Sequence, residues 1–327
     1  MRLRVTLLAA LGVALALYLL RYVGWHAVLT AAVAIGWAGF AVFCLCALGI
    51  FLVLGAAWRV LLPDAGRPPL AVFIRARMVR DASAEVLPFS QLGGIALGVR
   101  AAILQGLQPS LASASMIVDV TTEMLAQIVY TAVGLTILAV RVPASSRVAS
   151  LTLACVIGLV LAVIAAGLFV AVQRHGGRVA AKFAAPVLRG AGQTITGVTA
   201  AIEATYRSPG RIALSAALHL AAWIASGTAV WLGFRLIGAR VDLTSVIAIE
   251  SLVYAIRSAA ALVPNALGVQ EGAYVILAPL FGIGPDVALA VSVLKRARDI
   301  AVGVPVLLMW QAAESQRALA ARPTDAQ

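Results

Sequence analysis

The sequence is poor in charged residues, and this shortage decides the class of protein. Charged residues make up 12% of the 327 positions, whereas hydrophobic residues make up 62%. That balance leaves too little polar surface to cover a soluble particle of this length. We therefore expect an all-α, polytopic integral membrane protein.

Cysteine and histidine are too scarce to suggest a disulfide framework or a metal site. Cys44, Cys46 and Cys155 each lie inside an apolar run, which is typical of packing residues. The three histidines have no second ligand at motif spacing, and no nucleophile elbow, phosphate loop or His-Glu-x-x-His occurs. We expect no metal, no cofactor and no enzyme activity. The alternative that stays open is a membrane-embedded enzyme that uses Glu271 as a base.

Acidic residues are scarcer than basic ones, with 13 Asp and Glu against 25 Lys and Arg. The arginines lie at the ends of apolar runs and form no basic face with interleaved aromatic residues, so nucleic acid is not the expected partner. Positive loops facing anionic lipid explain the excess. Arg2 and Arg4 predict a cytoplasmic N-terminus. The apolar run at 5–20 has no clear cleavage site and predicts an uncleaved first span.

Apolar runs predict about seven membrane-spanning helices, each near the usual length of about 20 residues. The runs are 5–20, 33–57, 117–140, 151–172, 212–234, 243–262 and 287–310. A further run, 273–283, is too short to show whether it crosses or returns. Basic residues gather at 59–80 and 174–211, so we expect both segments on the cytoplasmic side.

Two stretches interrupt the apolar pattern with proline and glycine. They are Glu85-Val-Leu-Pro-Phe-Ser-Gln-Leu-Gly-Gly94 and Val263-Pro-Asn-Ala-Leu-Gly-Val-Gln-Glu-Gly272. Broken backbone at membrane depth is tolerated only inside protein or along a wet cavity. Paired breaks in two halves of a chain indicate a transporter-like site, although chance similarity is the alternative. We expect re-entrant elements at 83–108 and 259–284.

These elements divide one transmembrane domain, 1–327, into pseudo-repeated halves. The parts are 1–172, 173–209, 210–312 and a short tail at 313–327. Apolar residues at three-to-four-residue spacing predict an amphipathic cytoplasmic helix in 173–209, interrupted near Pro186. Arginines alternate with apolar residues in 68–84, which predicts a helix lying in the headgroup layer.

Charged residues inside the apolar segments need partners. Asp119 and Glu123 are four residues apart, so they share one helix face and require cations. Arg100 and Arg257 are the expected partners, because each is the only arginine in an otherwise apolar stretch. Glu250 lies two turns before Arg257 and should face the same lumen. Such a network either locks helices together or organises arginines that bind a lipid headgroup or phosphate.

The candidate site combines the two interrupted stretches with the arginines near them. The residues expected to contact a headgroup are Pro88, Gln91, Gly93, Gly94, Arg100, Arg257, Pro264, Asn265, Gly268, Gln270 and Glu271. A supporting charge network is expected from Glu85, Asp119, Glu123 and Glu250. Lys295 and Asp299, at four-residue spacing, can pair with each other, which would give these two charges a purely structural role.

Three motifs carry a family resemblance: Val263 to Gly272, Leu87 to Gly94, and Asp119-Val-Thr-Thr-Glu-Met-Leu-Ala-Gln-Ile128. With them the chain resembles the lysylphosphatidylglycerol synthase transmembrane-region family, the flippase-like part of bacterial multiple peptide resistance proteins. Within that family it is most similar to hopanoid-biosynthesis-associated membrane proteins of the HpnL type. The likeness covers nearly the whole chain, with Pro264-Asn-Ala-Leu-Gly268 standing where the family usually has Pro-Gly-Gly-Leu-Gly.

The resemblance implies a lipid translocation module with re-entrant helices around a central cavity, in a bacterial inner membrane. It implies hopanoid or phospholipid-type lipids as substrates, and no aminoacyl transfer. The expected partners are membrane lipids, proteins of hopanoid or lipid biosynthesis, and a second copy of the chain. The alternatives are a non-catalytic scaffold for hopanoid enzymes and a lipid-modifying enzyme.

Overall fold

The computed structural model describes residues 33, 35–64, 67–86, 90–143, 146–184, 191–260, 266 and 268–320. Every regular element within these ranges is helical, which confirms the expected all-α class. The first apolar run, 5–20, lies outside the described residues, as do Pro88, Pro264 and Asn265.

The described elements follow one another as helices of very different length. They are α3 (Gly36–Val60), α4 (Leu70–Val86), α5 (Ser90–Leu104), α6 (Pro109–Arg141), α7 (Ser146–Ala184), α8 (Ala191–Tyr206), α9 (Pro209–Leu236), α10 (Leu243–Ala259), α11 (Val269–Leu277), the 3-10 turn η2 (Ala278–Phe281) and α12 (Pro285–Ala320). Four of them, α3, α6, α7 and α9, are long and apolar enough to cross a membrane. The chain is therefore a multi-pass membrane protein.

The order of helices repeats within the described chain. A long helix, a 17-residue helix, a short helix and a very long helix occur as α3 to α6 and again as α9 to α12. Both very long helices, α6 and α12, begin with a proline, at Pro109 and Pro285. Proline suits the first turn because the N–H there has no partner within the helix.

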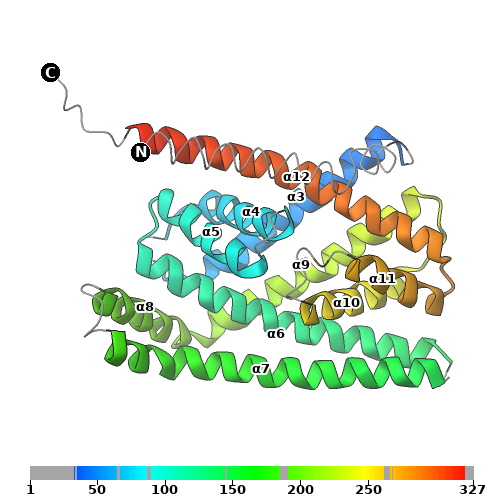
Figure 1. Cartoon of the computed structure of the whole chain (residues 1–327), viewed down its shortest axis with the longest axis horizontal. Coiled ribbons are helices and arrows are strands. Elements are labelled where there is room, and N and C mark those ends of the chain that lie inside the picture. Colours follow the sequence, from blue (N-terminus) through cyan, green and yellow to red (C-terminus); the bar gives the residue numbers. More distant parts are fainter. Residues whose placement is uncertain are drawn as a thin grey trace.

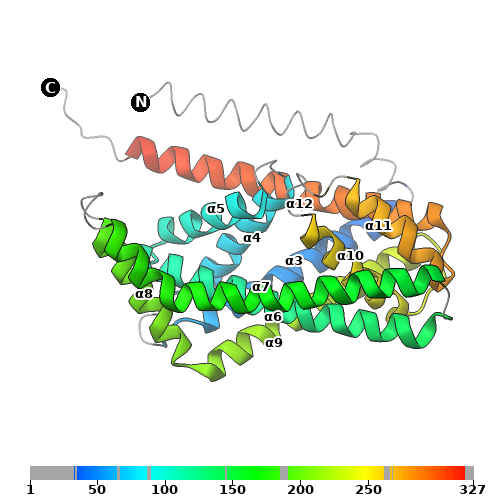
Figure 2. The same cartoon turned by 60° about the horizontal axis from the view of Figure 1, so that its bottom comes forward.

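The two sets of helices run in opposite directions. Phe43, in the first turns of α3, faces Gly233 near the end of α9, and Gly39 faces Leu236, the last residue of α9. The very long helices α6 and α12 likewise run in opposite directions along the length of the molecule (Figures 1 and 2). Helix α7 follows α6 along one long side. The repeat is therefore an inverted one.

Each half contains a helical hairpin. In the first, α5 lies so close to α4 that a Cβ at Gly94 would come within 2.5 Å of the carbonyl oxygen of Arg80. The second hairpin pairs α10 with α11 and η2, and its described return arm begins at Gly268, whose φ of 75° is easily adopted only by glycine. Both hairpins begin one helix earlier than the elements expected at 83–108 and 259–284, because α4 and α10 form their first arms.

Helix α4 confirms the helix predicted at 68–84 but not its expected position. Phe73, Ala76, Arg77, Val79 and Arg80 are all buried. The helix packs between α3, α5 and α12 instead of lying in the headgroup layer. The surface interpretation was wrong because Arg77 and Arg80 meet carboxylates inside the protein, described below, and therefore do not need water.

The segment at 173–209 is helical on both sides of residues 185–190, which lie outside the described ranges. Helix α7 continues to Ala184, and α8 packs on α6 and α7. Tyr206 donates a hydrogen bond to Oε1 of Gln173 at 2.8 Å, and Nε2 of Gln173 donates to Thr121 of α6 at 2.8 Å. The amphipathic segment is thus tied to the spanning helices by its own side chains.

Asp242 joins the end of α6 to the start of α10. Its carboxylate accepts a hydrogen bond from the backbone N–H of Ser245 at 3.1 Å, as an N-cap does, and pairs with Arg141 at 3.0 Å. Burial raises the pKa of Asp242, but hydrogen bonds from Thr244 and Ser245 and the charge of Arg141 lower it to about 2. The side chain therefore stays ionised at neutral pH, and the pair persists.

Replacement of Gly94 by alanine should loosen the first hairpin. The added methyl group would meet a backbone oxygen at 2.5 Å, which cannot rotate away. Overpacking of this kind costs about 1–3 kcal/mol. Thermal unfolding of purified Gly94→Ala protein in detergent micelles should show a lower Tm than that of Gly167→Ala, where the methyl group would meet nothing within 4 Å. Equal Tm values for the two variants would contradict the close packing.

Candidate functional site

The two hairpins meet at one ion pair near their tips. Glu85 lies in the last turn of α4 and Arg257 in the last turn of α10. Nη2 of Arg257 donates to both carboxylate oxygens of Glu85, at 2.8 and 2.7 Å. The Arg257 side chain is 11% exposed and that of Glu85 is 27% exposed. This contact joins the first half of the chain to the second across 172 residues of sequence.

A cavity of about 920 Å³ lies beside this pair. Its wall combines apolar side chains from α3, α6, α7 and α12 with charged ones. The charged side chains are Arg77, Arg80, Asp81, Glu85, Glu123, Arg257, Arg298 and Asp299. Pockets that bind small molecules have volumes of about 300–1,000 Å³. The cavity is therefore large enough for a lipid headgroup, and its wall carries equal numbers of positive and negative groups.

A buried network, here named the Asp119 cluster, ties α4 to α6 and α9. Its members are Arg77, Arg80, Asp81, Asp119, Glu123 and His219. Nε of Arg77 donates to Asp81 at 2.9 Å, its Nη1 donates to Asp119 at 2.8 Å, and its Nη2 donates to Glu123. Nη2 of Arg80 donates to the other oxygen of Glu123 at 2.7 Å. One guanidinium thus binds three carboxylates with its fork of donors.

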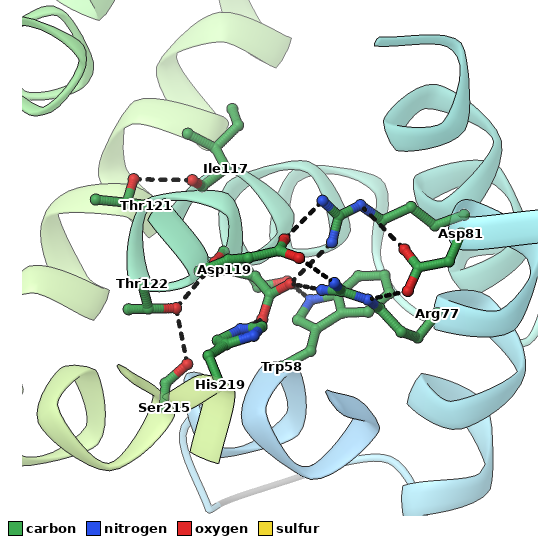
Figure 3. A network of polar contacts seen from close by, with 12 residues as sticks. Trp58, Arg77, Asp81, Ile117, Asp119, Thr121, Thr122, Ser215 and His219 are labelled. Carbon is green, nitrogen blue, oxygen red and sulfur yellow. Dashed lines mark hydrogen bonds and ion pairs between the residues drawn. The ribbon is translucent and has the colours of Figure 1, made fainter. Parts of the chain in front are cut away.

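Figure 3 shows Arg77 of α4 and Asp119 of α6 pointing toward each other, with His219 of α9 beside them. Nε2 of His219 lies 2.9 Å from the second carboxylate oxygen of Asp119. Asp119 and His219 are fully buried, and Arg77 is 2% exposed. Water screens such charges little, so each depends on the others. Among the described residues, no three acidic, histidine or cysteine side chains are arranged to hold a metal ion.

A second buried network, the Lys295 cluster, consists of Glu250, Tyr274 and Lys295. Nζ of Lys295 donates to Glu250 at 2.7 Å and to the hydroxyl oxygen of Tyr274 at 2.9 Å, and Tyr274 donates to Glu250. Nζ also lies 4.9 Å from the ring centroid of Tyr254, a cation–π distance. All three members of the cluster are fully buried. This network ties α10 to α11 and α12.

The two clusters occupy equivalent places with opposite charges. Arg77 stands seven residues after the start of α4, and Glu250 stands seven after the start of α10. Asp119 stands ten residues after the start of α6, and Lys295 ten after the start of α12. In each half, a buried ion pair therefore connects the first arm of the hairpin to the following long helix, with the signs exchanged.

The partners expected for the carboxylates were wrong. Asp119 and Glu123 bind Arg77 and Arg80, not Arg100 or Arg257. Arg100 lies at the surface, with its side chain 54% exposed, and pairs with Glu314 at 2.7 Å.

The pair that the spacing of Lys295 and Asp299 allowed does not form. Asp299 accepts hydrogen bonds from Arg298, at 3.0 and 2.7 Å, while Lys295 binds Glu250. The local spacing suggested contacts along one helix, but the tertiary packing satisfied these groups across helices.

In the second interrupted stretch, Ala266 lines the cavity, whereas residues 268–272 do not. The backbone N–H of Gly268 donates to Glu271 at 2.9 Å, and Glu271 also pairs with Arg296. Nε2 of Gln270 donates to Ser292 of α12 at 3.0 Å. These contacts cap α11 and hold it on α12. Gly268, Gln270 and Glu271 therefore stabilise the position of α11.

Of the residues expected to bind a headgroup, Arg257 is the one that lines the cavity within the described part of the chain, and Glu85 and Glu123 of the supporting network join it. Gln91, Gly93 and Gly94 belong to α5, where Gly94 permits close packing. Sequence reasoning missed the cavity residues Arg77, Arg80, Asp81, Arg298 and Asp299. The available signal was the spacing of Arg77 and Arg80, which places two cations on one face of α4.

These features define a multi-pass, all-helical membrane protein with two inverted halves and a charged interior. Residues 5–306 match the family described as Lysylphosphatidylglycerol synthase TM region, and the chain belongs to that family. Comparisons with curated proteins and with solved structures gave no match.

The Lys295 cluster allows a test of buried pairing. Lys295→Met should destabilise the protein by about 3–5 kcal/mol, because it leaves Glu250 buried without a cation. Adding Glu250→Gln should restore most of the lost stability, since the amide keeps a contact with Tyr274 without a charge. Chemical unfolding in detergent micelles measures both variants. Strictly additive losses in the double variant would show that the two groups do not interact.

Proposed function

We propose that this protein is a flippase-like translocase, which moves lipids of hopanoid or phospholipid type between the leaflets of the bacterial inner membrane. Family membership and the multi-pass fold support a lipid-related role in a membrane. One observation carries the finer proposal: two oppositely directed hairpins meet at Glu85 and Arg257 beside a cavity of about 920 Å³. Inverted repeats with interrupted helices are a common construction of transporters, whose substrates bind where the repeats meet.

The chemistry of the cavity wall suits an amphipathic substrate. Arginine forks bind phosphate and other polar headgroup oxygens, and carboxylates accept hydrogen bonds from hydroxyl or amino groups. Helix α7 supplies apolar wall residues, and only 6% of its 18-residue apolar stretch is buried inside the protein. A headgroup can therefore pass along the charged interior while its apolar chains stay in the bilayer.

The charge distribution supports a cytoplasmic end for α3 and, with the first span predicted at 5–20, a cytoplasmic N-terminus. Arg211 at the start of α9 pairs with Asp64 after α3 at 2.9 Å, so these two segments share one end of the molecule. Arg59, Arg67 and Arg207 lie near them in sequence, whereas Arg141 lies at the far end of α6. Excess arginine marks the cytoplasmic side.

Two exposed prolines provide a matched test of this orientation. In a variant whose three cysteines are replaced by alanine, Pro63→Cys after α3 should be shielded from an impermeant thiol reagent applied to intact cells. Pro143→Cys after α6 should react, because it lies at the opposite end. Labelling at position 63 without labelling at position 143 would reverse the proposed orientation.

Lipid movement itself is testable in proteoliposomes of phosphatidylethanolamine and phosphatidylglycerol that contain a fluorescent phosphatidylethanolamine. Arg257→Gln should slow the transfer of probe between leaflets about tenfold, equivalent to about 1.4 kcal/mol in barrier height. Arg141→Gln, which breaks a half-exposed pair at the end of the molecule, should have little effect.

The outcomes of this assay separate the candidate functions. A wild-type protein that moves no lipid would contradict the proposal and favour a scaffold. A change in the mass of a lipid, measured on the same vesicles, would favour a lipid-modifying enzyme. Equal rates for Arg257→Gln and Arg141→Gln would remove the pair at the hairpin tips from the mechanism.

A further inference from the structure

The Asp119 cluster carries an excess of one negative charge when His219 is neutral. Arg77 and Arg80 supply two positive charges, and Asp81, Asp119 and Glu123 supply three negative ones. The neighbouring charged groups of α10 and α12 pair elsewhere: Glu250 with Lys295, Arg257 with Glu85, and Arg298 with Asp299. On α3, Trp58 faces this region and donates its indole N–H to Ser115. The excess charge is therefore not neutralised by these neighbours.

A net charge held in a largely buried cluster is costly, and one bound proton removes it. The carboxylates are poor places for that proton, since Glu123 accepts hydrogen bonds from both arginines, and Asp119 and Asp81 each accept one from Arg77. Protonation of either would sacrifice a charge-assisted bond. The imidazole of His219 is the remaining group, and histidine is the side chain suited to changing charge near neutral pH.

The second ring nitrogen of His219 is also unsatisfied. Nδ1 is buried and has no hydrogen-bond partner among the described residues. With Nε2–H donating to Asp119, a neutral ring leaves Nδ1 as an idle acceptor and the cluster with its excess charge. A protonated ring neutralises the cluster but buries an Nδ1–H without an acceptor, which is unfavourable. In this conformation neither protonation state satisfies every group.

We propose that the Asp119 cluster is a proton-binding site, that His219 takes up the proton, and that its uptake and release couple a proton gradient to lipid translocation. The proposal rests on the translocase function proposed above. One N–H bond forms at Nδ1 when the proton enters, and the same bond breaks when it leaves. Arg77, Arg80 and Glu123 line the cavity, so protons reach the cluster from it.

The proposed movement of α4 arises because the carboxylate of Asp119 is shared between two partners. Asp119 divides its two oxygens between His219, at 2.9 Å, and Arg77, at 2.8 Å. An imidazolium attracts Asp119 more strongly than a neutral ring does, and this weakens its hold on Arg77 and thus on α4. The α4–α5 hairpin, with Glu85 near its tip, is then held to α6 through Glu123 but less tightly through Asp119, and it can shift. The Lys295 cluster offers no equivalent, because Glu250 and Lys295 already balance.

The coupling is tested in the proteoliposomes described above, with and without an imposed pH gradient of either direction. The gradient should raise the wild-type rate by at least about fivefold, the low end of ordinary coupling between sites. In His219→Gln the ratio of rates with and without the gradient should fall to one. The matched control is Ser215→Ala, which removes a buried hydrogen bond of 2.9 Å to Thr122, one turn from His219, without changing a titrating group. It should keep the wild-type ratio.

A second measurement does not depend on transport. In protein with His26→Gln and His175→Gln, the only remaining imidazole is that of His219. Its nitrogen resonances, recorded by NMR on ¹⁵N-histidine-labelled protein while the pH is varied, should move as the ring gains and loses its proton.

The transport assay and the NMR experiment test separate claims, so one can fail without the other. Wild-type protein that moves no lipid contradicts the translocase, while the resonances still decide whether the proton site exists. Lipid movement that ignores the gradient, or that responds equally in wild type and in His219→Gln, overturns the coupling. Resonances of His219 that do not change with pH overturn the proton site itself. A well-folded His219→Gln protein, checked by its Tm, is required for the comparison of rates.

Discussion

The arrangement of this protein depends on the neutralisation of charge inside an apolar body. Arg77 lies 2% exposed in a helix of an apolar protein, and it is tolerated there because its guanidinium meets Asp81, Asp119 and Glu123. The same contacts hold α4 against α6. Since α4 is the first arm of a hairpin whose turn could not face hydrocarbon, this network fixes the hairpin inside the protein.

The two halves satisfy this constraint with exchanged signs. An ion pair between Arg77 and Asp119 and one between Glu250 and Lys295 perform the same task, because the attraction between two opposite charges does not depend on which helix carries which. The repeat therefore preserves places and complementarity, not residue types. For the same reason the repeat is weak in the sequence, where only the proline and glycine interruptions were visible.

Composition and periodicity predicted the membrane class, the all-helical fold and most helix positions, since these depend on local hydropathy. They did not predict that α4 is interior, because the alternation of arginines with Val72, Phe73 and Ile74 fits a headgroup layer as well as a buried face lined with carboxylates. Asp119 was correctly expected to need a cation, but its partner Arg77 is 42 residues away. His219 stood alone in an apolar run, and only the packing of α9 on α6 reveals its carboxylate.

The clusters and the hairpin tips are mechanically connected because helices are stiff. Arg77 and Glu85 lie on α4, and Glu250 and Arg257 lie on α10, each pair separated by about two turns, or roughly 11–12 Å at 1.5 Å per residue. A shift of either helix at its cluster must therefore displace the Glu85–Arg257 pair, which both helices share. Because that pair borders the cavity, a displacement of either helix also changes the cavity wall. In this inverted fold, the two separate charge networks are therefore both connected to one ion pair, Glu85–Arg257.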